Sequence, residues 1–290
     1  MSVFIFPGQG SQKKGMGGSL FDEVKEFLEA EAQIDALLGY SLRRLCLDDP
    51  ENQLKQTQFT QPCLYVVNAL HYYMGVAAGA RAEYMAGHSL GEYNALLAAG
   101  AFDLLTGLKL VKRRGELMAQ ATNGGMAAVL GLEMGAVERV LQNNGMVGID
   151  VANDNSPTQI VVSGPIEDIQ RAAPFFEKAG AKLYMPLPVS AAFHSRYVTE
   201  AAQSYGTFLQ GFSFDQLRIP VIANVTGQPY PDGDASAVIR SLLVQQITQA
   251  VQWTQSVRYL LNQGQTQFME MGPGNVLTRL VQDIQQGRQA

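Results

Sequence analysis

The chain has 290 residues, of which 47% are hydrophobic and 16% are charged. This composition excludes an intrinsically disordered chain, and the length allows one large core with a smaller inserted module. A net charge of −5 gives no general attraction for nucleic acid, and two cysteines without metal-ligand spacing indicate neither a disulfide framework nor a metal site. We therefore expect a monomeric cytoplasmic protein that binds no nucleic acid and no metal.

Short β-branched and aromatic runs alternate with amphipathic stretches of helical length, a pattern typical of an α/β fold. Strands are predicted at Val3–Phe6, Tyr84–Ala86, Ile219–Val225 and Gln267–Met271. Helices are predicted at Leu20–Leu38, Pro62–Ala77, Leu90–Ala99, Asp103–Gln120, His194–Gln210, Ala237–Gln263 and Val276–Gln285. The first apolar run is too short for a signal peptide or a membrane span, so we expect no membrane association.

The middle of the chain follows a different order, β-α-β-β-α-β, which is typical of a ferredoxin-like module. Its segments are Met126–Gly131, Met134–Gln142, Ile149–Asn153, Gln159–Gly164, Pro165–Lys178 and Lys182–Leu187. We place it as an insert at residues 123–188, between the core segments 1–122 and 189–290. Glycine and proline pairs near both boundaries favour hinges there.

Ser89 lies in the motif Gly87-His88-Ser89-Leu90-Gly91, between a predicted strand and a predicted helix. Glycines two positions to either side allow a tight strand-to-helix turn that exposes a nucleophilic hydroxyl, with the Leu90 N–H facing a developing oxyanion. The alternative is a capping box, in which Ser89 and Glu92 merely begin the helix. The pentapeptide alone leaves both interpretations open.

Three histidines are candidates for a general base. His88 adjoins Ser89, where neighbouring side chains diverge, and His71 lies in an amphipathic helical run. His194 follows a proline-punctuated segment just past a predicted strand, where site residues gather in α/β folds. A lone histidine is usually structural, but elimination favours His194 as the base for Ser89.

Arg114 lies on the apolar face of its predicted helix, with Leu110, Val111, Leu117 and Met118 one turn away. A buried guanidinium is costly unless it meets an anion. That anion can be an internal Asp or Glu, or the carboxylate of an acyl substrate, which a planar guanidinium binds in bidentate fashion. Both remain open.

The sequence resembles the malonyl-CoA:acyl carrier protein transacylase family over essentially its whole length. The blocks that carry the resemblance are Phe6-Pro7-Gly8-Gln9-Gly10-Ser11-Gln12, Gly87-His88-Ser89-Leu90-Gly91-Glu92-Tyr93, Arg113-Arg114-Gly115-Glu116-Leu117-Met118, Asn155-Ser156-Pro157, Pro188-Val189-Ser190 leading to His194, Val251-Gln252-Trp253 and Gly272-Pro273-Gly274. Two further blocks, Lys13-Lys14-Gly15-Met16-Gly17 and Gln58-Phe59-Thr60-Gln61-Pro62, look most like trans-acting acyltransferases of modular polyketide synthases.

The resemblance implies an α/β-hydrolase-like core with the ferredoxin-like insert. It implies ping-pong transfer of malonyl from malonyl-CoA to an acyl carrier protein through an acyl-serine, without a cofactor. Ser89 and His194 would be catalytic, the backbone N–H groups of Gln9 and Leu90 would form the oxyanion hole, and Arg114 would bind the malonyl carboxylate.

Three further residues enter through the resemblance. The backbone carbonyl of Gln246 would orient the histidine in place of an acid, and Asn155 would help to bind the substrate. Phe193 resembles the malonyl-selecting form of the family signature, because methylmalonyl enzymes commonly carry a small Ser there and a ring leaves less room for an α-methyl group. The chain departs from the fuller signature, which begins with His where Ser190 or Ala191 stands.

Three rival functions stay open from the sequence. A thioesterase or acyl hydrolase would use the same Ser-His pair, but the resemblance suggests that such relatives often lack the arginine. A malonyl transacylase of fatty-acid synthesis and a non-catalytic carrier-binding protein are the others. Basic residues at Lys109, Lys112, Arg113, Lys13 and Lys14 can meet an acidic carrier or the CoA phosphates, although a solvated helix face is the simpler interpretation.

Overall fold

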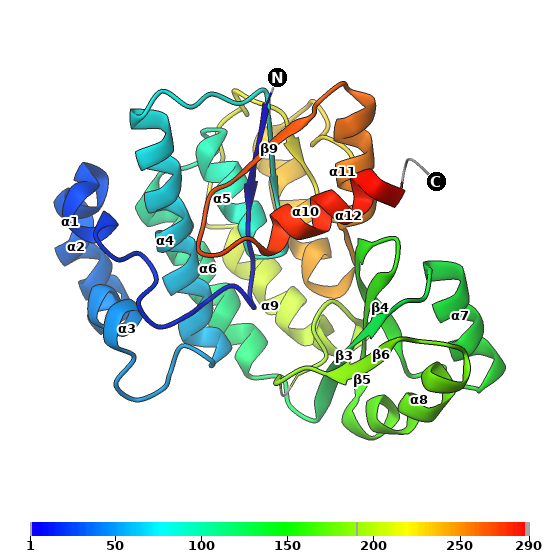
Figure 1. Cartoon of the computed structure of the whole chain (residues 1–290). Coiled ribbons are helices and arrows are strands. Elements are labelled where there is room, and N and C mark those ends of the chain that lie inside the picture. Colours follow the sequence, from blue (N-terminus) through cyan, green and yellow to red (C-terminus); the bar gives the residue numbers. More distant parts are fainter. Residues whose placement is uncertain (1, 190, 288–290) are drawn as a thin grey trace.

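A computed structural model describes residues 2–189 and 191–287 and shows two sheets (Figure 1). The first sheet is parallel, with strand order β7-β2-β1-β9. Its strands are β1 (Ser2–Phe6), β2 (Tyr84–Gly87), β7 (Val221–Ile222) and β9 (Gln267–Glu270). The two central strands are buried almost throughout, which explains why both are continuous apolar runs in the sequence.

Helices cover this parallel sheet, and α4 packs along α6. The helices of the core are α1 (Leu20–Glu23), α2 (Lys25–Leu38), α3 (Leu42–Asp48), α4 (Thr57–Ala77), α5 (Gly91–Ala98), α6 (Leu104–Ala119), η1 (Arg196–Val198), α9 (Thr199–Leu209), α10 (Ala235–Thr248), α11 (Trp253–Asn262) and α12 (Val276–Gly287). In Figure 1 the short helices α1 to α3 lie at the opposite end of the molecule from the second sheet.

The segments predicted as the insert form four strands of the second sheet and two helices beside it. The strands are β3 (Gly124–Leu130), β4 (Asp150–Ser156), β5 (Gln159–Pro165) and β6 (Leu183–Pro186), and the helices are α7 (Met134–Asn143) and α8 (Ile166–Lys178). The order β6-β3-β5-β4, with antiparallel neighbours, is that of a ferredoxin-like module, and a separate apolar cluster fills it. The predicted α/β fold class is confirmed, whereas the boundaries at residues 122/123 and 188/189 stay a prediction.

One strand links the two parts of the molecule. β8 (Val251–Gln252), from the C-terminal segment, pairs in parallel with β4. The Gln252 N–H also donates to the Asn224 carbonyl, 2.8 Å away. The predicted helix Ala237–Gln263 is therefore wrong as one element, because these tertiary hydrogen bonds pull its middle into an extended strand and leave α10 and α11 on either side.

Other predicted boundaries are also corrected. The helix predicted at Leu20–Leu38 breaks at Val24, whose ψ of 111° is extended. The strand predicted at Ile219–Val225 contracts to β7, and the helix predicted from His194 begins only at η1. α3 has no counterpart among the predicted helices; it is a single short helix whose Ser41 side chain caps its first turn.

Candidate active site

Ser89 stands on the sharp turn between β2 and α5, with a φ of +49° that non-glycine residues rarely adopt. A Cβ added to Gly87 would lie 2.0 Å from the backbone of Gly91, and one added to Gly91 would lie 2.0 Å from the Phe6 carbonyl oxygen. Both glycines are therefore required for the close approach of strand, turn and helix. This is the geometry of a nucleophile elbow.

The capping-box interpretation of Ser89 does not hold. Within the described part of the chain no side-chain hydrogen bond caps α5, and the Ser89 hydroxyl instead contacts two groups from distant elements. The Glu92 carboxylate accepts hydrogen bonds from Tyr230 and Gln246 rather than turning back to the helix start. The serine hydroxyl is thus directed into the site.

His194 reaches Ser89 from the segment before η1. Its Nε2 lies 2.8 Å from Ser89 Oγ, and its Nδ1 lies 2.7 Å from the backbone carbonyl oxygen of Gln246. Because a carbonyl only accepts, Nδ1 carries the hydrogen and Nε2 is free to accept the serine proton. Burial, followed by the charge of Arg114, lowers the pKa of His194 to about 3, so the imidazole is neutral at physiological pH.

The other two histidines make no hydrogen bond to Ser89 in the described part of the chain. His71 lies within α4. His88 adjoins Ser89, but its Nε2 lies 2.7 Å from Asn155 Oδ1 and its ring is edge-on to Trp253. Burial lowers the pKa of His88, so this ring is also neutral. Asn155 thus contacts His88, and its predicted part in substrate binding stays a prediction.

Arg114 is buried in α6, with 1% of its surface exposed. Its Nη1 donates to Gln61 Oε1 at 2.9 Å, and its Nη2 donates to Gln246 Oε1 at 2.9 Å and to Ser89 Oγ at 3.2 Å. The guanidinium also lies over the Tyr93 ring, 5.6 Å from its centroid.

Among the described residues, the guanidinium of Arg114 donates only to neutral oxygens, the amide oxygens of Gln61 and Gln246 and the hydroxyl of Ser89. None of the ion pairs among the described residues involves it, so the structural ion pair considered from the sequence is not present. Three of the five N–H donors of a guanidinium are engaged, and the buried Nε–H has no partner in the described part of the chain. The site therefore holds a cation with spare donors.

Ser89, His194 and Arg114 line one cavity of about 110 Å³. Its other lining residues are Gln9, Gln61, His88, Leu90, Met118, Met126, Asn153, Leu187, Val189 and Phe193. A second cavity of about 260 Å³ shares Gln9, His88, Asn153 and Leu187 with the first and extends to Asn155 and α12.

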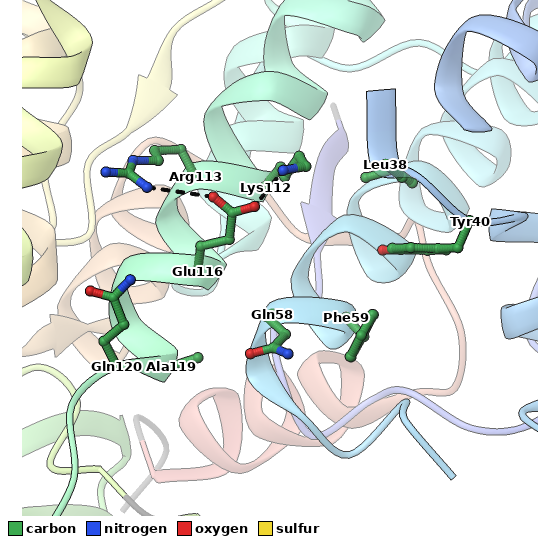
Figure 2. Close-up of a pocket in the computed structure, with 9 residues that line it drawn as sticks. All are labelled: Leu38, Tyr40, Gln58, Phe59, Lys112, Arg113, Glu116, Ala119 and Gln120. Carbon is green, nitrogen blue, oxygen red and sulfur yellow. Dashed lines mark hydrogen bonds and ion pairs between the residues drawn. The ribbon is translucent and has the colours of Figure 1, made fainter. Parts of the chain in front are cut away.

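The basic residues predicted on the exposed face of α6 are partly neutralised by an acid on the same helix. Figure 2 shows Lys112 and Arg113 of α6 converging on Glu116, with both ion pairs drawn beside a surface cavity of about 390 Å³. This arrangement agrees with a solvated face and leaves less free charge for an acidic partner than the sequence suggested.

Several residues of the site were given no role in it from the sequence. They are Gln61, Glu92, Asn224 and Tyr230, all buried and hydrogen-bonded around the elbow. A signal was available for Gln61, because it begins an otherwise apolar helical run that includes Leu64 and Val67. Asn224 and Tyr230 lie far from any motif, and only the fold brings them near Ser89.

Neither cysteine forms a disulfide, and both are buried. Across residues 2–189 and 191–287, no three His, Cys, Asp or Glu side chains group as metal ligands would. Over the same residues, every helix is too short or too polar to span a bilayer.

A hydroxyl next to a neutral imidazole can attack an acyl carbonyl, so the elbow, the histidine and the parallel sheet define a serine enzyme of acyl chemistry. A family model described as "Acyl transferase domain" matches residues 3–289. The chain belongs to this family, and within it to the malonyl CoA-acyl carrier protein transacylases.

Individual relatives cover nearly the whole chain. "Polyketide biosynthesis malonyl CoA-acyl carrier protein transacylase BaeC" of Bacillus velezensis is 53% identical, covering 100% of this chain and 99% of that protein. "Malonyl CoA-acyl carrier protein transacylase" of Escherichia coli K12 is 38% identical, covering 97% and 92%. The crystal structure of a malonyl CoA-acyl carrier protein transacylase from Burkholderia pseudomallei has a TM-score of 0.93 at 49% identity, covering 99% and 98%.

Proposed function

We propose that this protein transfers a malonyl group from malonyl-CoA to the phosphopantetheine thiol of an acyl carrier protein, through an acyl intermediate on Ser89. The observation that carries the proposal is the placement of a buried arginine, which has no ion pair among the described residues, in the same small cavity as a serine paired with a neutral histidine. The serine and imidazole suffice for the chemistry, so the enzyme uses malonyl-CoA as substrate and no cofactor.

In the first half-reaction, His194 Nε2 accepts the Ser89 proton as Oγ attacks the thioester carbonyl. The backbone N–H groups of Gln9 and Leu90 stabilise the oxyanion; both residues line the cavity, and neither N–H donates a hydrogen bond within the described part of the chain. The imidazolium, oriented by the Gln246 carbonyl, then protonates the departing CoA thiolate. In the second half-reaction the carrier thiol gives its proton to His194 and attacks the acyl-serine carbonyl, and the leaving Ser89 Oγ takes that proton back from the imidazolium.

Arg114 binds the free carboxylate of the malonyl group. A guanidinium with spare N–H donors binds a carboxylate through two parallel hydrogen bonds, and the low polarity of the cavity strengthens them. Phe193 lines the same cavity and limits the space beside the α-carbon, which favours malonyl over a branched extender.

The biological setting that we propose is polyketide synthesis, with the enzyme acting in trans. Two relatives named for polyketide biosynthesis, from Bacillus velezensis and Bacillus subtilis, are 53% and 48% identical and have about the same length as this chain. The Escherichia coli relative is 38% identical. An acyl carrier protein is the acceptor partner; a solved relative with TM-score 0.90 is titled as a type II PKS acyl-carrier protein in complex with its malonyl-transacylase.

The test is loading of a purified holo carrier protein from labelled malonyl-CoA and acetyl-CoA by the wild type and by Arg114→Ala. We expect Arg114→Ala to lower kcat/KM for malonyl by about 100-fold or more, since it removes charge-assisted hydrogen bonds of about 1.5–3 kcal/mol each, while acetyl loading is spared. Arg113→Ala, one residue away on the surface, is the control and should keep both rates.

Two results would contradict the proposal. Unchanged malonyl loading by Arg114→Ala would show that Arg114 does not bind the malonyl carboxylate. Release of free malonate by the wild type much faster than loading of the carrier would instead favour the acyl hydrolase, which uses the same serine and histidine.

A further inference from the structure

We infer that Glu92 and the side chain of Gln246 are positioning residues that set acyl selectivity, because together they fix the orientation of the amide that holds Arg114. The inference rests on the proposed role of Arg114 as the malonyl anchor. It adds a second function to Gln246, whose backbone carbonyl already orients His194.

The side-chain amide of Gln246 lies between two hydrogen-bond acceptors, which its NH₂ group faces, and one donor, which its oxygen faces. Its Nε2 donates to the Ser89 carbonyl oxygen at 2.9 Å and to the Glu92 carboxylate. Its Oε1 accepts from Arg114 Nη2 at 2.9 Å. The residue is fully buried, so bulk solvent reaches neither end of the amide. Both acceptors therefore specify the same orientation.

Glu92 is itself held on several sides. Tyr230 Oη donates to its Oε1 at 2.6 Å, and the backbone N–H of Asn224 donates to the same oxygen at 3.3 Å. Asn224 in turn accepts from the Ser89 N–H at 2.6 Å, so the acid is built into the elbow that carries the nucleophile. Glu92 is 1% exposed and cannot swing out to solvent.

The orientation matters because arginine has only donors. A flipped Gln246 amide would set its NH₂ group against the guanidinium and its oxygen against the Glu92 carboxylate, leaving buried groups without partners. Arg114 would then lose one of its two amide contacts and shift within the cavity. The carboxylate of Glu92 thus acts on the substrate anchor through Gln246.

The second amide contact of Arg114 is less well specified. Gln61 accepts from Arg114 Nη1 at 2.9 Å, but the one partner of its Nε2 within residues 2–189 and 191–287 is the Met118 sulfur at 3.5 Å, a weak acceptor. Over the same residues no carboxylate fixes the Gln61 amide. The better-determined contact is therefore the one through Gln246, and substitutions there should disturb Arg114 the most.

The first test variant is Glu92→Gln, which preserves the shape but offers a donor where the carboxylate accepted. We expect the ratio of kcat/KM for malonyl to kcat/KM for acetyl to fall by about 10-fold to 100-fold, the loss expected for one or two hydrogen bonds to a charged group. Glu116→Gln, an acid on the surface of α6, is the matched control and should keep the wild-type ratio.

The second variant keeps the same chemical groups and exchanges their positions. Glu92→Gln combined with Gln246→Glu leaves one amide and one carboxylate in the buried pair but sets the carboxylate directly against Arg114. We expect the guanidinium to be neutralised there, so that the malonyl-to-acetyl ratio falls at least as far as in the single variant. The melting temperature of each variant is measured in parallel.

The outcomes separate this inference from the proposed function. If Arg114→Ala lowers the ratio but both Glu92→Gln and the exchange variant keep it, the positioning role is wrong and the anchor stands. If Glu92→Gln lowers malonyl and acetyl loading equally, together with the melting temperature, its role is structural only and the inference also fails. If Arg114→Ala leaves the malonyl-to-acetyl ratio of kcat/KM unchanged, the proposed function itself is contradicted.

Discussion

The cavity at Ser89 has two unlike sides. One is polar and densely hydrogen-bonded, with Arg114, Gln246 and Glu92 joined behind the nucleophile. The other is apolar and consists of Met118, Met126, Leu187, Val189 and Phe193. On the polar side, each hydrogen bond has a defined donor and acceptor, so the position of the guanidinium charge and the route of proton transfer are fixed. The apolar side sets only size and shape, so it is the side on which substitutions should be tolerated.

The largest effect is expected on the polar side, from His194→Ala. Loss of the general base should lower kcat for malonyl loading by about 10²–10⁴-fold, because Ser89 then has no acceptor for its proton. Loading is followed by quench-flow with labelled malonyl-CoA. His88→Ala serves as the comparison for the ring that bonds Asn155, and its fall should be much smaller. An equal loss in both variants would break the assignment of the base.

On the apolar side, Phe193→Ser should change selectivity more than rate. Opening the wall beside the α-carbon should raise the methylmalonyl-to-malonyl ratio of kcat/KM by about 10-fold to 100-fold, since one methyl group is worth about 1–3 kcal/mol in such a pocket. Phe175→Ser, on α8 and outside both site cavities, controls for loss of an aromatic ring. A large fall in malonyl kcat without any gain in methylmalonyl use would show that Phe193 serves the chemistry instead.

The smallest effect is the pH dependence of malonyl loading, which distinguishes His194 from Glu92 on the polar side. His194, with a pKa near 3, stays neutral from pH 8 to pH 5 and causes no loss there. Burial raises the pKa of Glu92 to about 7, so lowering the pH from 8 to 6 protonates it and weakens its hydrogen bond from Gln246. Tyr230, which faces it, keeps its proton because burial raises its pKa well above the usual value.

We therefore expect kcat/KM for malonyl to fall by about fivefold at most between pH 8 and pH 6, the difference between a charge-assisted and a neutral hydrogen bond. The fall should disappear in Glu92→Gln. An inflection near pH 6.5 that persists in this variant would assign the titration to an ordinary imidazole and contradict a neutral, buried His194.

Much of the fold was predictable because its signals are local. Spacing and composition over a few residues predict the apolar runs of β1 and β2 and the glycines around Ser89. They also predict the four strands and two helices of the ferredoxin-like module. Elimination among three histidines also leads to the one that contacts Ser89.

What the sequence did not show depends on contacts between distant segments. The pairing of β8 with β4 breaks a helix that periodicity alone extends to Gln263. The partners of Arg114 are Gln61 and Gln246, which lie 53 and 132 positions from it in the chain, and neutral amides leave no charge pattern to follow. The role of Glu92 was not predicted, because its spacing from Ser89 is also that of a helix-capping residue.

Ser89 should carry the malonyl group between the two half-reactions. This intermediate can be trapped by brief exposure of the protein to malonyl-CoA without carrier protein and detected by intact-protein mass spectrometry. We expect one malonyl adduct on the wild type, located on Ser89 by peptide mapping, and none on Ser89→Ala. An unlabelled wild type, or the same adduct on Ser89→Ala, would show that the transfer does not pass through this serine.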